Sequence, residues 1–136
     1  MSISQQDTET IIAASQARAR ELDLRVTVAV VDEGGLLKGL SRMDSAPPLS
    51  SQIAEAKAQG AAVWHRDGHV LAEVQKDRSA FVAAVSQLTR LPLMPVAGSL
   101  VIRDDSEAVV GAVGISGATS EEDRDCAQAG IAALSA

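Results

Sequence analysis

Three charged side chains of this sequence combine the chemistry of proton transfer with that of anion binding: Asp32, Arg42 and Lys57. Asp32 has the carboxylate of a general base, and the Arg42 guanidinium suits an oxyanion. Lys57 is flanked by alanines, where partial burial would let its ammonium group bind a carboxylate. All three are candidates both for catalysis and for ligand binding. The competing interpretation is an Asp32–Arg42 pair that closes a hairpin and a Lys57 that extends into solvent.

The two histidines, His65 and His69, are the candidates for binding a metal or haem iron. Four residues apart, they would share one face of a continuous helix, but the Asp67-Gly68 pair between them is a turn signal. Two exposed histidines in a loop, without any ligand, are therefore the alternative. Weaker candidates for an axial iron ligand are Met43, Met94 and Cys126.

The segment from Gly114 to Ser120 leads into a predicted helix. The backbone N–H groups at the start of that helix could bind a carboxylate. We therefore include Gly117 among the ligand-binding candidates. Three acidic residues follow at 121–123, however, and they would repel an anion and suit a helix cap instead. No P-loop, GxGxxG, HExxH or GxSxG motif is present.

The composition limits the class of protein. A chain of 136 residues predicts a single domain, 1–136. A net charge of −6 and only two aromatic residues, Trp64 and Phe81, exclude nucleic acid as a partner. One cysteine excludes an intrachain disulfide, and neither a leader nor a membrane-spanning run is recognisable, so we expect a cytoplasmic protein that does not bind membranes.

Two β-hairpins are expected to position the candidate residues. Residues 26–32 are rich in β-branched side chains and apolar on both faces, which predicts a strand covered on both sides. The Gly34-Gly35 turn returns the chain into a second strand at 36–42, and this would bring Asp32 and Arg42 close together. Residues 100–103 and 107–115 form the second hairpin, in which small residues predict close contact with a helix.

Helices are expected before, between and after the two hairpins. We expect them at 4–22, from 49 or 50 to 65, at 77–88, and from Thr119 onward, where Thr119 and Glu122 have the spacing of a capping box. The predicted order is helix, hairpin, helix, helix, hairpin, helix. This order indicates an α+β sandwich, an antiparallel sheet of about five strands with helices on its faces.

Five blocks of the sequence, spread over nearly the whole chain, resemble one family. They are VAVVDEGGLL at 28–37, RMD at 42–44, AEAKA at 54–58, VGAVGISG at 110–117 and DRDCAQAG at 123–130. Their order and spacing are similar to those of the GlcG/HbpS-like haem-degrading domains, which include the C-terminal domain of PduO-type adenosyltransferases. The resemblance implies a profilin-like sandwich that forms homo-oligomers.

The same resemblance implies haem as a cofactor, with Lys57 and Arg42 meeting carboxylates such as the haem propionates. The family often has a histidine after the two glycines of the first hairpin, whereas this chain has Leu36. Its place as an iron ligand then falls to His65 or His69. Gly60 and Ser99 also depart from the family's usual residues.

Two main hypotheses for the function follow. The first is an oligomeric small-ligand-binding protein, with haem held between subunits. The alternative is a cofactor-independent isomerase, hydratase or hydrolase that acts on a small oxygenated metabolite through Lys57, Asp32 and Arg42. A purely structural or regulatory subunit is a third possibility.

Overall fold

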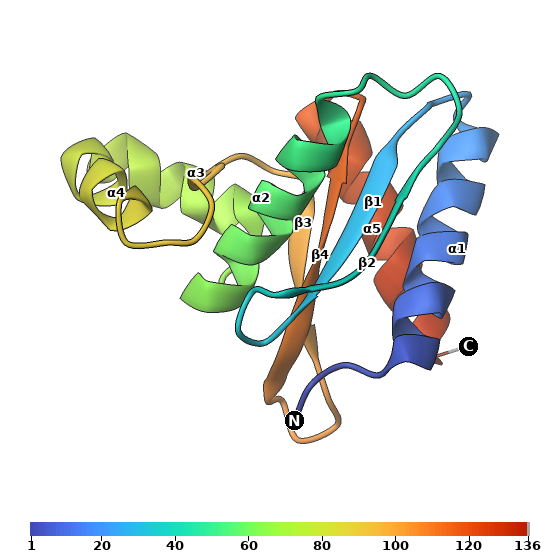
Figure 1. Cartoon of the computed structure of the whole chain (residues 1–136), viewed down its shortest axis with the longest axis horizontal. Coiled ribbons are helices and arrows are strands. Elements are labelled where there is room, and N and C mark those ends of the chain that lie inside the picture. The colour runs from blue at the N-terminus through green and yellow to red at the C-terminus, as the bar shows by residue number, and fades with distance from the viewer. Residues whose placement is uncertain (136) are drawn as a thin grey trace.

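An antiparallel sheet of four strands is the centre of the computed structural model, which describes residues 1–135. The strands are β1 (Thr27–Asp32), β2 (Leu37–Arg42), β3 (Ser99–Arg103) and β4 (Val109–Ser116). Their order across the sheet is β2-β1-β4-β3, so the two predicted hairpins join through the central strands β1 and β4 (Figure 1). The expected α+β class is confirmed, but about five strands is wrong for the described residues. The segment between the hairpins is helical and supplies no further strand.

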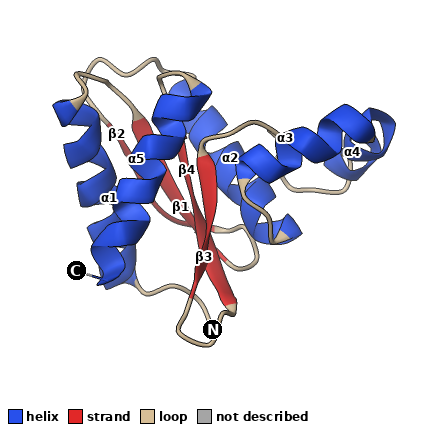
Figure 2. Ribbon diagram, turned by 180° about the vertical axis from the view of Figure 1, so that it is seen from behind, coloured by secondary structure: helices blue, strands red, loops and turns tan. Residues whose placement is uncertain are grey.

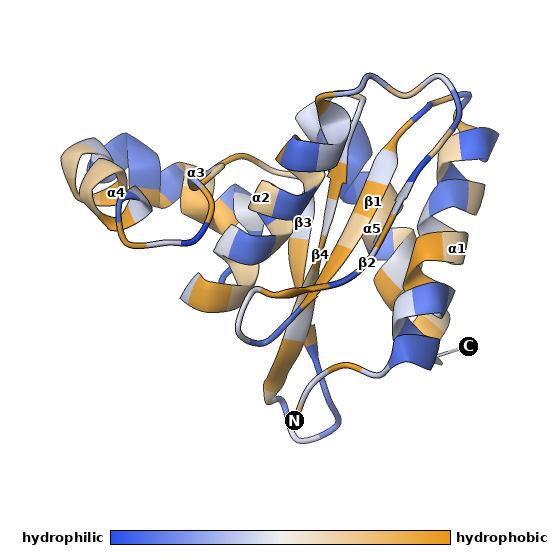
Figure 3. Ribbon diagram, viewed as in Figure 1, coloured by the Kyte–Doolittle hydropathy of each residue, from blue (hydrophilic) through white to orange (hydrophobic). Residues whose placement is uncertain are grey.

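Strand β1 is buried on both faces, as its apolar sequence predicts. Val28 and Val30 face the helices on one side, while Val31 packs with alanines of the helix on the other side. Hydrophobic residues are concentrated on the central strands, and hydrophilic ones colour the outer face of the first helix (Figure 3). The sheet is therefore the middle layer of three.

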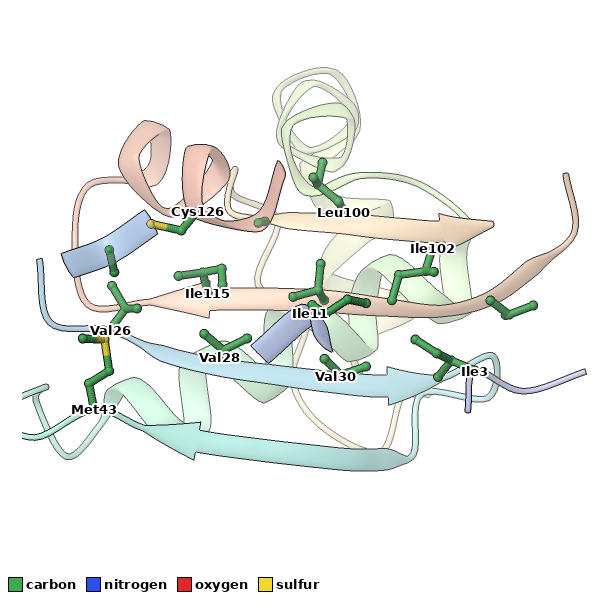
Figure 4. Packing of buried hydrophobic residues seen from close by; sticks show 14 residues of the cluster. Ile3, Ile11, Val26, Val28, Val30, Met43, Leu100, Ile102, Ile115 and Cys126 are labelled. Carbon is green, nitrogen blue, oxygen red and sulfur yellow. The ribbon is translucent and has the colours of Figure 1, made fainter. Parts of the chain in front are cut away.

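Helices α1 (Gln5–Glu21) and α5 (Ser120–Ala132) cover one face of the sheet, and a short 3₁₀ turn, Ala133–Ser135, follows α5. Ile11 of α1 and Cys126 of α5 point into the same apolar cluster as Val26, Val28 and Val30 (Figure 4). Both helices begin at a side-chain cap. Ser4 caps α1, and the predicted capping box of Thr119 and Glu122 is present at α5.

Helix α2 (Ser50–Trp64) covers the opposite face and contacts the central strands very closely. A Cβ atom at Gly114 of β4 would lie 2.2 Å from the carbonyl oxygen of Ala54 and 2.7 Å from the backbone nitrogen of Ala58. Only glycine fits there, because the backbone of α2 rests directly on that of the strand. The small residues of β4 thus have the packing role that the sequence predicts.

Helices α3 (Gly68–Asp77) and α4 (Ser79–Ser86) project away from the sandwich beyond α2 (Figures 1 and 2). The predicted third helix, 77–88, corresponds to α4, but the sequence reasoning missed α3. The Asp67-Gly68 pair is typical of a turn, whereas in the structure Asp67 precedes the first turn of α3 and accepts a hydrogen bond from the Val101 N–H at 2.8 Å. No helix among residues 1–135 has the length and apolar character needed to cross a bilayer.

Candidate functional site

Helices α2, α3 and α4 border an open, solvent-facing cavity of about 850 Å³ at the end of the molecule where α3 and α4 project. Its aromatic wall contains Trp64 and Phe81, whose rings meet edge to face with centroids 6.2 Å apart. The Arg78 guanidinium lies over the Phe81 ring, 4.0 Å from its centroid. The remaining lining residues are Val63, His65, Arg66, Val74, Asp77, Val85 and Thr89. We call this space the aromatic cavity; it combines an apolar wall with cationic groups and an imidazole.

His65 ends α2 in an unusual backbone conformation. Its φ and ψ of 56° and 36° are left-handed, a region that glycine adopts at the ends of helices at much lower cost. The side chain is exposed and borders both the aromatic cavity and a smaller cavity next to β3. Among residues 1–135, none forms a hydrogen bond with its imidazole. His65 is therefore available to a ligand.

His69 lies in the first turn of α3 and is half-buried. Its Nδ1 atom is buried without a hydrogen-bond partner. Since α2 ends before His65 and α3 begins after it, the two histidines do not share a helix face, as the sequence predicts. The aromatic cavity includes His65 but not His69 in its lining.

Lys57 of α2 forms a buried ion pair with Asp123 of α5. The Lys57 Nζ donates to Asp123 Oδ2 at 2.9 Å and to the Ile115 carbonyl at 2.8 Å, and the two side chains are only 4% and 2% exposed. The other carboxylate oxygen accepts the Ala118 N–H at 3.1 Å. Burial raises the pKa of Asp123 above its usual value, and the nearby ammonium group only partly offsets this. The carboxylate that Lys57 meets in this structure thus belongs to the protein itself.

This ion pair connects α2 on one face of the sheet with α5 on the other, next to the residue that precedes β3. Gly98 has a positive φ of 120°, and a Cβ there would lie 2.8 Å from Lys57 Nζ and 3.0 Å from Asp123 Cβ. A glycine is therefore needed for the lysine to reach its partner. Lys57 is not in the lining of the aromatic cavity, and its part in binding an external ligand stays a prediction.

Asp32 and Arg42 lie at opposite ends of the first hairpin, so the expectation that they meet is wrong. Asp32 is next to the turn, where Oδ1 accepts the N–H groups of Gly34 and Leu36 at 2.9 and 3.0 Å. Arg42 pairs with Thr27 at the other end, because the start of one antiparallel strand faces the end of its partner. A pairing of these two side chains in one active site is therefore not available within this chain.

Gly117 connects β4 to α5 at the same end of the sheet as Arg42. Its φ is 132°, and a Cβ would lie 2.5 Å from the Arg25 carbonyl oxygen. The glycine is thus required by the close approach of the neighbouring chain. Its predicted role in ligand binding stays a prediction.

The sequence reasoning missed the aromatic cavity. The sequence predicts Trp64 and Phe81 on two separate helices and does not indicate that they meet, because it does not reveal α3 between those helices. The apolar residues Val70, Leu71 and Val74 have helical spacing and were the available signal.

Cys126 is completely buried in the core, and burial raises the pKa of its thiol from 9.0 to about 11. The folded state therefore favours the neutral thiol, and the resulting stabilisation is lost as the pH rises from about 9 to about 11. We expect the free energy of unfolding of the wild type to fall by about 2 kcal/mol more over this range than that of Cys126→Ala. Urea unfolding near both ends of the range measures the difference, and equal declines would contradict it.

A family model and a curated protein each match most of this chain. The sequence model of the family described as "Haem degrading protein HbpS-like" matches residues 3–132. Protein GlcG of Escherichia coli K12 is 38% identical over 116 residues, which are 84% of this chain and 81% of GlcG.

Two crystal structures share the fold. That of the PduOC:haem complex superposes with a TM-score of 0.87 at 31% identity and covers 98% of this chain and 95% of its own. That of HbpS has a TM-score of 0.88 at 26% identity and covers 98% of this chain and 91% of its own.

Proposed function

Since the chain belongs to the HbpS-like family of haem-degrading proteins, we propose that it binds haem in the aromatic cavity, with His65 as an iron ligand. The relative that was crystallised with haem supports the choice of ligand, because it is similar over 98% of this chain. The observation that carries the choice of site is His65, an unpaired imidazole beside an aromatic wall.

The lining of the aromatic cavity fits the chemistry of haem. Trp64 and the face of Phe81 that the Arg78 guanidinium does not cover offer aromatic surface to a porphyrin, and Arg66 and Arg78 offer cations to its two carboxylates. The volume of about 850 Å³ falls within the usual range for cofactor sites. Bound haem would supply a redox-active iron, whereas the protein would supply the ligand, the apolar surroundings and the counter-charges.

The backbone of His65 supports a role for its side chain. A non-glycine residue in the left-handed region costs about 1 kcal/mol, and a glycine would avoid most of this cost. The chain has a histidine where a glycine would be less strained, which supports a role for the imidazole. Leu36, where relatives often have histidine, is 55% exposed and has no group that coordinates iron, so an iron ligand must come from elsewhere.

Replacing His65 with glycine tests both parts of this argument. We expect His65→Gly to retain the free energy of unfolding of the wild type or to raise it by up to about 1 kcal/mol, because the backbone strain is removed. The same variant should lose the Soret band of ligated haem when haem is titrated into it. Urea unfolding and absorption spectra measure the two effects separately.

His69→Gln is the matched control, since it removes the other histidine but not the one in the aromatic cavity. Its Soret band should match that of the wild type. An unchanged haem spectrum in His65→Gly, or loss of the band only in His69→Gln, would refute the assignment of the iron ligand.

The alternative of a cofactor-independent enzyme has no specific observation in its favour. Asp32 and Arg42 are separated by the length of the hairpin, and the Lys57 ammonium is occupied by Asp123. The proposal of a homo-oligomer has more support. Leu37, the first residue of β2, is 46% exposed, Leu36 just before it is 55% exposed, and this strand forms one edge of the sheet. A cytoplasmic location stays a prediction.

A further inference from the structure

We propose that a second cavity, between the end of α1 and the end of β2, binds a small anion that carries carboxylate or phosphate groups. This cavity has a volume of about 380 Å³. It is lined by Gln16, Arg20, Arg25, Ser41, Arg42, Met43 and Asp44, and we call it the arginine cavity.

The lining of the arginine cavity is positively charged, whereas the protein as a whole is negatively charged. The chain has a net charge of −6, yet three guanidinium groups and a single carboxylate, that of Asp44, line this space. Within the described part of the chain, neither Arg20 nor Arg42 forms a salt bridge. Arg25 contacts Asp23 at 3.6 Å, but Asp23 is 95% exposed and outside the lining. The cationic charge of the cavity is therefore largely uncompensated.

A favourable interaction with the helix dipole accounts for the position of one of the three arginines. Arg20 is in the last turn of α1, where a cation interacts favourably with the helix dipole. Arg25 belongs to the loop after α1 and Arg42 to the end of β2, so neither gains from that dipole. All three arginines are solvent-exposed, so an anion in the cavity could accept charge-assisted hydrogen bonds from more than one guanidinium.

The protein holds two of these guanidinium groups in place. Arg42 donates from Nη1 to the Ala46 carbonyl at 2.9 Å, and Arg25 donates from Nη1 to the Leu24 carbonyl at 3.0 Å. A guanidinium has about five N–H donors, so most of them stay available to a ligand. Hydrogen bonds also connect α1 to β2 where the two elements line the cavity. Gln16 Nε2 donates to the Ser41 carbonyl at 3.2 Å and to the Ser41 hydroxyl at 2.9 Å.

The size and lining of the cavity define the ligand class. A volume near 380 Å³ is at the small end of the range for metabolite sites, which favours a compound of a few carbons. Guanidinium forks match the planar oxygens of a carboxylate or the oxygens of a phosphate. The arginine cavity is formed by α1 and β2, whereas the aromatic cavity is formed by α2, α3 and α4, so the two sites are separate.

Calorimetric titration of the whole chain with succinate and with inorganic phosphate tests this proposal. We expect saturable binding of at least one of the two, and the stronger one identifies carboxylate or phosphate as the recognised group. Arg42→Ala should weaken the binding about tenfold or more, because it removes charge-assisted hydrogen bonds. Arg42→Lys, which retains the charge but not the fork, should have an intermediate effect.

Two further variants separate a loss of binding from a loss of structure. Arg20→Gln changes an exposed side chain of the cavity and should also weaken binding. Arg103→Ala is the matched control, since the Arg103 side chain is exposed and lies outside the cavity, where it donates a hydrogen bond to the Glu107 carbonyl. It should bind the anion as the wild type does.

Three results would overturn the proposal: no saturable binding of either anion at millimolar concentrations, an unchanged affinity in Arg42→Ala, or an equal loss in Arg103→Ala. The last would indicate general attraction to surface arginines. The aromatic cavity does not include Arg42 in its lining, unlike the sequence-based expectation that this residue meets a haem carboxylate. Haem binding by Arg42→Ala should therefore match that of the wild type, so failure of this proposal is distinct from failure of the haem site.

Discussion

Asp123→Ala is expected to destabilise the folded protein by about 3–5 kcal/mol, because it leaves the Lys57 ammonium buried without its counter-charge. Lys57 is 4% exposed, so water cannot replace the carboxylate without local opening of the structure. Among the residues that the structure describes, its Nζ would keep one hydrogen-bond partner, the Ile115 carbonyl. Urea unfolding followed by circular dichroism measures the loss.

Removing both charges should cost less than removing one. We expect the double variant Lys57→Met/Asp123→Leu to be more stable than either single replacement, since no isolated charge is then buried. Asp125→Ala is the matched control on the same helix. It breaks the partly exposed Arg18–Asp125 pair and should change stability far less. A loss in Asp123→Ala no larger than in Asp125→Ala would contradict the assignment of a buried pair.

Gly114→Ala is expected to destabilise the protein by about 3 kcal/mol, because the added methyl group has no space between β4 and α2. Its Cβ would lie 2.2 Å from a backbone oxygen of α2, and a backbone atom cannot move aside as a flexible side chain can. The shift required would separate the helix from the sheet over several residues. The same unfolding measurement detects it.

Gly34→Ala is the control for the Gly114 prediction. Gly34 is exposed in the turn of the first hairpin, and the nearest atom to a Cβ there is Asp32 Oδ1 at 3.4 Å, an ordinary contact. We expect a change within about 0.5 kcal/mol. Equal stabilities of Gly34→Ala and Gly114→Ala would refute the close packing of α2 on β4.

The sequence predicted the sandwich because its strongest local patterns coincide with its architecture. The β-branched residues before Gly34 and the small residues around Gly114 both predict a central strand that is covered by helices on its two faces. The Thr119–Glu122 capping box was likewise visible, since a cap depends on residues three apart. The helix α3 was not found, because a glycine after an aspartate is more typical of a turn than of a helix start.

The candidate sites depend on contacts that no local pattern contains. Lys57 and Asp123 are 66 residues apart in sequence, and nothing in the alanine-rich surroundings of Lys57 indicates that its partner lies on another helix. The separation of Asp32 from Arg42 follows from the register of the hairpin, which places Arg42 opposite Thr27. Trp64 and Phe81 meet only because α3 turns the chain back toward α2.

The most direct test of the proposed haem site uses the indole N–H signal of Trp64, the single tryptophan, in nitrogen-15-labelled protein. Paramagnetic ferric haem broadens signals steeply with decreasing distance, and gallium protoporphyrin provides the diamagnetic reference. Because Trp64 lines the aromatic cavity, we predict that its signal disappears as ferric haem approaches one equivalent, while backbone signals around Arg42 persist. A sharp Trp64 signal in protein saturated with ferric haem would contradict the proposed site.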